Sequence, residues 1–216
     1  MSDRFYVIRL PIVGKLRSST DYYTPFDTSF GKAVHCPSCG QALSMLEWLP
    51  PFKAELKCWG RQHADIAFGV QDILVSEALA DAFRAEKLSG LEILDSVSIV
   101  KVVPKKMAGS APKYFVGRIG WAEKAALDDK ASGADYEGPW DCPECRVGYN
   151  LLRFKRIALE PNTWLGEDIF YPRRLGPAHP LVSERFKEFF ERRQFRGVLF
   201  IPAEEFSVDY DPEEVE

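Results

Sequence analysis

Two stretches of the chain repeat the apolar spacing of a buried helix face. Leu79, Ala82 and Phe83 follow the i, i+3, i+4 pattern, and Phe186, Phe189 and Phe190 repeat it. Other segments alternate apolar and polar positions, which predicts strands at residues 4–10, 91–103, 115–121 and 153–159. The pattern therefore predicts an α+β fold in which strands outnumber helices.

Both predicted helices begin and end with the same signals. Each follows a Val-Ser-Glu triplet, in which Ser76 or Ser183 is the expected N-cap and the glutamate suits the first turn. Gly90 and Gly197 are expected to end the helices, and an apolar strand follows each. Residues 105–113 and 128–139, which contain glycine and proline, are expected to be a hairpin loop and a flexible polar loop.

Two Cys-Pro-x-Cys knuckles carry the strongest chemical signal. The first has Cys36 and Cys39 followed by Gly40, and the second has Cys142 and Cys145 followed by Arg146. Two such pairs predict a Cys₄ metal site, but the pairs of a zinc ribbon are usually about 15–20 residues apart. Here roughly 100 residues separate them. One ion bound by all four sulfurs would therefore join two distant parts of the chain.

An internal repeat gives a reason for this spacing. Cys36 precedes Ser76 by 40 positions and Cys142 precedes Ser183 by 41, and an Asp-Ile pair lies between knuckle and helix in both cases. We therefore expect one domain built from two related halves, residues 1–122 and 123–204, with an acidic tail at 204–216. Packing of the halves about an approximate twofold axis would bring one knuckle from each to a shared centre.

The expected metal is one structural Zn²⁺ per chain. Four thiolates fill the zinc tetrahedron and leave no position for water or substrate. The same ligands also suit rubredoxin-like iron, and loss of the metal from an ancestral site is a further alternative. The three histidines are part of no catalytic motif, and His35 is expected only to pack beside the first knuckle. We therefore expect no enzymatic activity.

Charge is distributed unevenly along the 216 residues. The formal net charge is −4, but residues 204–216 contain seven carboxylates and no basic residue, so the remainder carries +3. This tail is either a solvated end or a surface for a basic partner, and alternation at residues 206–210 suggests an edge strand. The candidate partner-binding residues are Glu204, Glu205, Asp209 and Asp211.

A basic stretch supports a different function. Residues 96–122 contain no acid, and their basic and aromatic side chains suit nucleic acid or an acidic partner; these residues are Lys101, Lys105, Lys106, Lys113, Tyr114, Phe115, Arg118 and Trp121. The solvated face of a hairpin is the favoured interpretation, because the chain is acidic overall. Without an export signal or an apolar span, a cytoplasmic protein is expected, and Cys58 is expected to be a small buried residue.

The two knuckles, the Val-Ser-Glu helix starts and the closing strand from Gly197 to Pro202 together resemble the double-CXXCG motif family. The resemblance extends from the first strand to Pro202, and Arg146 departs from it where the motif has glycine. Members of that family are myxobacterial proteins that look like immunity proteins for the Sit swarm-inhibition toxins. The resemblance implies a cytoplasmic protein that binds and neutralises one cognate toxin. A zinc-stabilised nucleic-acid-binding or regulatory protein is the alternative.

Overall fold

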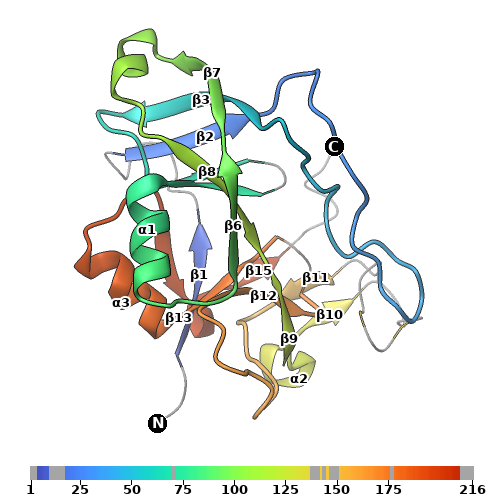
Figure 1. Cartoon of the computed structure of the whole chain (residues 1–216). Coiled ribbons are helices and arrows are strands. Elements are labelled where there is room, and N and C mark those ends of the chain that lie inside the picture. Colours follow the sequence, from blue (N-terminus) through green and yellow to red (C-terminus); the bar gives the residue numbers. More distant parts are fainter. Residues whose placement is uncertain are drawn as a thin grey trace.

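The computed structural model describes residues 4–9, 18–69, 72–136, 142, 145, 151–175 and 178–209 (Figure 1). These ranges contain fifteen strands and three short α-helices. This confirms the predicted α+β class with more strands than helices. No helix in the described residues is long and apolar enough to cross a membrane.

The largest sheet has seven strands and closes on itself. Its order is β6-β8-β5-β4-β2-β3-β7, and its end strands β6 and β7 are separated in sequence only by Val97. The N–H of Val97 bonds to the carbonyl of Tyr114 (2.8 Å), and the N–H of Ser98 bonds to that of Phe52 (2.9 Å). One bent strand therefore joins the two ends of the sheet. The strands are β2 (Ser18–Tyr23), β3 (Lys53–Gly60), β4 (Ile66–Phe68), β5 (Ile73–Ser76), β6 (Leu91–Ser96), β7 (Ser98–Val103) and β8 (Tyr114–Ile119).

The second sheet has five strands in the order β14-β1-β13-β12-β9, and a third has three in the order β10-β11-β15. Phe154 of the small sheet and Phe170 of the larger one belong to the same buried cluster, so these two sheets share a core. The strands are β1 (Phe5–Arg9), β9 (Trp121–Ala126), β10 (Asp135–Tyr136), β11 (Leu151–Phe154), β12 (Ile169–Arg173), β13 (Leu181–Ser183), β14 (Leu199–Pro202) and β15 (Val208–Asp209).

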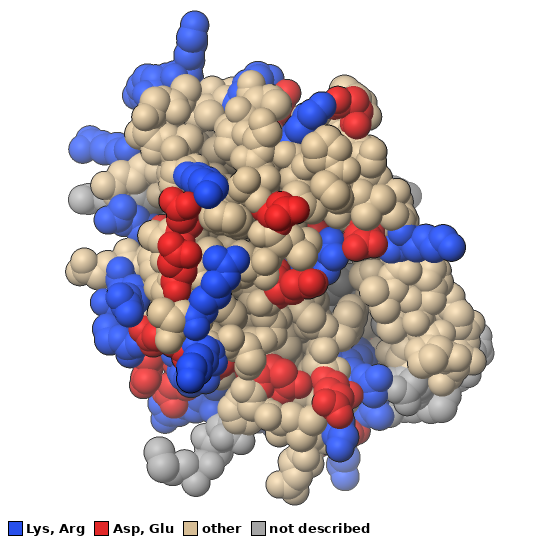
Figure 2. All heavy atoms as spheres, viewed as in Figure 1, with Lys and Arg blue, Asp and Glu red and all other residues tan. Residues whose placement is uncertain are grey.

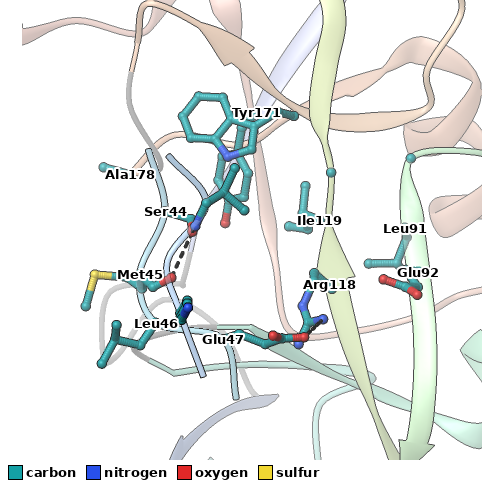
Figure 3. A pocket seen from close by; sticks show the side chains of 15 residues that line it. Ser44, Met45, Leu46, Glu47, Leu91, Glu92, Arg118, Ile119, Tyr171 and Ala178 are labelled. Atoms are coloured by element: carbon teal, nitrogen blue, oxygen red, sulfur yellow. Dashed lines mark hydrogen bonds and ion pairs between the residues drawn. The ribbon is translucent and has the colours of Figure 1, made fainter. Parts of the chain in front are cut away.

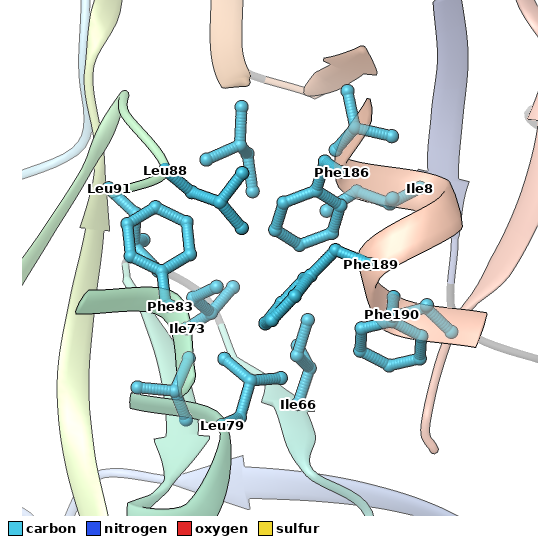
Figure 4. Packing of buried hydrophobic residues seen from close by; sticks show 14 of the residues in the cluster. Ile8, Ile66, Ile73, Leu79, Phe83, Leu88, Leu91, Phe186, Phe189 and Phe190 are labelled. Carbon is cyan, nitrogen blue, oxygen red and sulfur yellow. The ribbon is translucent and has the colours of Figure 1, made fainter. Parts of the chain in front are cut away.

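A central apolar cluster lies between the two large sheets and contains both longer helices. Helix α1 (Glu77–Ala85) contributes Leu79 and Phe83, and α3 (Glu184–Arg192) contributes Phe186, Phe189 and Phe190 (Figure 4). The rings of Phe83 and Phe186 lie 6.3 Å apart. Burial of one such side chain contributes about 2–3 kcal/mol, so this cluster is a main source of stability.

The serine caps form as predicted. The hydroxyl oxygen of Ser76 accepts the N–H of Leu79 (3.3 Å), and that of Ser183 accepts the N–H of Phe186 (3.2 Å). The prediction that glycine ends each helix is wrong in detail. The helices end at Ala85 and Arg192, and Lys87 and Gln194 adopt the positive φ of the following turn.

Gly90 and Gly197 are needed for close packing instead. Both have positive φ, and a Cβ added to Gly90 would collide with the carbonyl oxygen of Ile169. A Cβ on Gly197 would collide with Ala64 and with the backbone of Ile66. Each post-helix turn therefore touches an Asp-Ile pair that lies far away in the sequence.

Two aspartates, the half-buried Asp65 and the buried Asp168, make nearly the same hydrogen bonds at these contacts. Asp65 accepts the Ser76 hydroxyl (2.7 Å) and, through its other carboxylate oxygen, the N–H of Arg196 (2.9 Å). Asp168 accepts the Ser183 hydroxyl (3.0 Å) and the N–H of Ser89 (2.9 Å). Each aspartate therefore ties the cap of one helix to the turn that follows the other helix.

Several local predictions need correction. The strand expected at 115–121 is two strands that meet at Gly120, and the loop at 105–113 contains the 3-10 helix η1 (Lys105–Ser110). Helix α2 (Asp129–Ser132) and strand β10 occupy the first part of the loop expected at 128–139; residues 137–139 lie outside the described residues. The strand expected at 153–159 is β11, which ends at Phe154. The edge strand expected near the C-terminus is short, because β15 contains only Val208 and Asp209 among the described residues.

Candidate metal centre

The first knuckle lies at the end of an arm between β2 and β3. We call residues 23–49 the arm; they form the dark blue loop at the right of Figure 1. Isolated β-bridges join Phe30 to Trp48 and His35 to Ala42, so the arm is a narrow ladder that returns on itself. In the knuckle the N–H of Gly40 bonds to the carbonyl of Cys36 (2.9 Å), and Gly40 has a φ of 75°. Glycine suits this turn because it has no Cβ.

The four cysteine sulfurs of the two knuckles meet in space. All of them lie within 4.8 Å of one another. The sulfurs of Cys36 and Cys142 are 3.9 Å apart, and those of Cys39 and Cys145 are 3.6 Å apart. Sulfurs bound at 2.3 Å to a tetrahedral zinc ion lie about 3.8 Å from each other. The cluster therefore has the size of a Cys₄ metal site, and it joins residues 106 positions apart.

The backbone of the first knuckle favours a thiolate at Cys36. Burial raises the pKa of this thiol, but the N–H groups of Cys39 and Ser38 point at its sulfur and lower the pKa to about 7. At Cys39 the N–H of Gln41 also lowers the pKa of the thiol. Desolvation of the sulfur and the neighbouring sulfurs of Cys142 and Cys36 outweigh this effect, so the pKa of Cys39 is raised. Four sulfurs this close cannot all be ionised without a cation between them, because their negative charges repel.

The donor set decides what the cluster can do. Thiolates are soft ligands that select zinc or iron, and a zinc ion bound by four of them has no open position. Cys36, Cys142 and Cys145 are buried, and Cys39 is exposed. These features fit a structural ion better than a catalytic one. Arg146, which replaces the glycine of the motif in the second knuckle, lies outside the described residues.

The candidate partner-binding acids lie elsewhere. Glu204 and Glu205 are exposed in the 3-10 helix η2 (Ala203–Glu205), and Asp209 is exposed at the end of β15. Asp211 lies outside the described residues. A role for these carboxylates in binding a partner stays a prediction.

Three of the five cations in the basic stretch contact acids from other elements. Lys101 pairs with Glu55 (2.7 Å) and Lys113 pairs with Glu77 (3.0 Å). Arg118 contacts the carboxylates of Asp72 (3.3 Å) and Glu47 (3.0 Å). The stretch lacks acids in sequence but not in space, which weakens the case for nucleic-acid binding.

Cys58 is buried as expected, but it has a partner that sequence reasoning missed. Its sulfur lies 3.1 Å from Nδ1 of His63, and Nε2 of His63 lies 2.9 Å from the carbonyl oxygen of Met107. A carbonyl oxygen only accepts, so Nε2 donates to it and Nδ1 accepts a hydrogen bond from the S–H of Cys58. Burial raises the pKa of Cys58, which keeps it a thiol. Cys58 is therefore part of the buried cluster of the seven-stranded sheet, and as a thiol it is not an activated nucleophile.

The comparisons with known proteins give no further guidance. A scan against models of protein families finds no match to this chain, and a search of curated proteins finds no related sequence. The function of the protein is therefore inferred from the geometry of the cysteine cluster and from the resemblance carried by the knuckles.

Proposed function

We propose that this protein is a cytoplasmic immunity protein that binds and neutralises one cognate toxin, and that a Cys₄ zinc ion holds its fold together. The meeting of four cysteine sulfurs within 4.8 Å carries the structural part of this proposal. A closed site of this kind stabilises a shape but offers no place for a substrate. The toxin partner is supported by the resemblance to the double-CXXCG family.

The proposal includes two related halves. The N–H of Glu77 donates to the carbonyl of Lys113, the residue that precedes β8 (2.9 Å). In the same way, the N–H of Glu184 donates to the carbonyl of Arg4, the residue that precedes β1 (3.1 Å). The same residues form ion pairs, Lys113 with Glu77 and Arg4 with Glu184. In this interpretation β8 begins the second half, earlier than residue 123, and each half places its first strand in the sheet of the other. Such an exchange makes a second copy of the chain unnecessary for folding.

The proposed function is tested by co-expression with the product of the adjacent gene. We expect the two proteins to co-purify at equal stoichiometry and host cells to survive expression of the toxin. A variant with Phe186→Ala, which empties part of the central core, should protect less because less folded protein is present. Continued toxicity with soluble wild-type protein, together with no complex, would contradict the proposal.

A gel-shift assay addresses the alternative. Because three of the five cations in the basic stretch are paired with acids, few remain to release counterions, and we expect no shift of DNA or RNA at physiological salt. A shift that weakens steeply with added salt would favour nucleic-acid binding instead.

A further inference from the structure

Exposed apolar side chains are concentrated on the arm. Nine large hydrophobic residues are exposed in the described part of the chain, and six of them lie between residues 23 and 46. Solvent-exposed apolar groups gathered in one place mark interaction surfaces. The six are Tyr23, Phe26, Phe30, Val34, Met45 and Leu46.

A groove of about 830 Å³ separates this arm from the body of the protein (Figure 3). Val34 and Ser44 line it from the arm, while Leu91, Ile119 and Tyr171 line it from the sheets. The side chains of Met45 and Leu46 point away from Arg118 and form the outer edge of the groove (Figure 3). An apolar surface thus continues from the groove floor over the edge of the arm.

Carboxylates outnumber cations around Arg118, which lines the groove. Arg118 contacts Asp72 and Glu47 directly, and Glu92 lies on its other side on β6 (Figure 3). Burial alone would lower the pKa of Arg118, but these three carboxylates raise it, so one guanidinium serves three acids. Among the described lining residues the formal charges balance, since Lys32 and Arg118 stand against Glu47 and Glu92. Figure 2 shows acidic side chains in the middle of this face, next to a mostly uncharged surface on the right.

We propose that this groove binds a segment of the toxin that presents apolar side chains next to a lysine or arginine. The apolar floor and outer edge would receive the side chains, and Glu92 with Glu47 would receive the cation. The three carboxylates around Arg118 disfavour nucleic acid as the occupant, since phosphates would be repelled there. This inference rests on the proposed function, because the toxin is the partner.

The arm is held on two sides, which keeps the groove open. Arg118 bonds to Glu47 and to the carbonyl of Trp48 (3.3 Å) at the base of the arm. The cysteine cluster joins the tip of the arm to the second knuckle. Preorganised walls lower the entropic cost of binding a flexible segment.

The test measures the dissociation constant for the purified product of the adjacent gene in a catalytically inactive form. Val34→Asp and Leu46→Asp should each weaken binding at least tenfold, because a charge would enter an apolar contact. Glu92→Lys should weaken it similarly by repelling the partner's cation. Val100→Asp on β7 is the matched control, since Val100 is 52% exposed like Val34 at 55% but does not line the groove.

Each result has a defined meaning if the variants melt within about 2 °C of wild type. Binding by wild type with loss confined to the groove variants supports the inference. Binding by wild type and by the groove variants within twofold overturns the inference and leaves the proposed function standing. No binding by wild type overturns both. Tighter or unchanged binding by Glu92→Lys overturns the assignment of a basic segment.

Discussion

Replacing one cysteine of the second knuckle should destabilise the whole protein. Cys142→Ser removes a ligand that joins residues 106 positions apart. A cross-link across a loop of this length removes chain entropy from the unfolded state worth about 5 kcal/mol. Apparent binding free energies of structural zinc are larger, about 10–16 kcal/mol in small domains, so the metal can supply this amount. We therefore expect the free energy of unfolding to fall by about 5 kcal/mol.

In a domain of this size such a loss lowers the melting temperature by roughly 10–20 °C. Thermal unfolding followed by circular dichroism at pH 7.5, with metal content measured in parallel, checks the prediction. Ser38→Ala is the control, because Ser38 lies between two ligands, is exposed, and acts on Cys36 through its backbone N–H, which alanine keeps. A Cys142→Ser protein that loses its metal but melts like wild type would refute the reasoning that the ion joins the fold.

Further predictions concern other parts of the fold. Gly90→Ala should lower the free energy of unfolding by about 3 kcal/mol or more in denaturant titrations, because its Cβ would collide with Ile169. Gly109→Ala, where nothing lies within 4 Å of the added Cβ, should change it by less than about 0.5 kcal/mol, and equal effects would contradict the packing argument. Burial and Arg9 lower the pKa of His179 to about 4. Since unfolded histidine has a pKa near 6.5, the unfolded state binds the proton first, and stability falls as the pH decreases from about 6.5 toward 4. Between pH 7 and 5, the free energy of unfolding of His179→Phe should therefore fall by about 2 kcal/mol less than that of wild type. Denaturant titrations in which both proteins show the same pH dependence would contradict this prediction.

The parts of the fold that depend on neighbouring residues in the sequence were predictable. The caps at Ser76 and Ser183 need only a hydroxyl beside a helix start, so the Val-Ser-Glu triplets identified them. The knuckles were predictable for the same reason, and their common offset from the helices indicated that they meet.

Features that depend on contacts between distant segments were not predictable. The break at Gly120 divides one apolar alternation between two different sheets, and periodicity alone cannot show this. The role of Gly90 depends on the backbone of Ile169, which is remote in sequence. The neutralisation of Arg118 by Asp72 likewise follows from pairing between β5 and β8.

The groove was missed because its walls come from the arm and from both large sheets. Nothing in the sequence around Val34 or Tyr171 indicates that these two residues line the same groove. The composition of the arm does indicate a contact surface, since residues 28–46 contain only one charged side chain, Lys32. In a chain that is 28% charged, a long segment with so few charges indicates a surface that contacts other protein.

We infer that one metal ion binds four sulfurs and joins two distant segments of the chain. X-ray absorption at the zinc edge, combined with metal analysis of the purified protein, examines this ion and its ligands. We predict one zinc per chain surrounded by four sulfurs at about 2.3 Å. Protein that contains no zinc or iron, or zinc with nitrogen or oxygen ligands in place of sulfur, would contradict the claim.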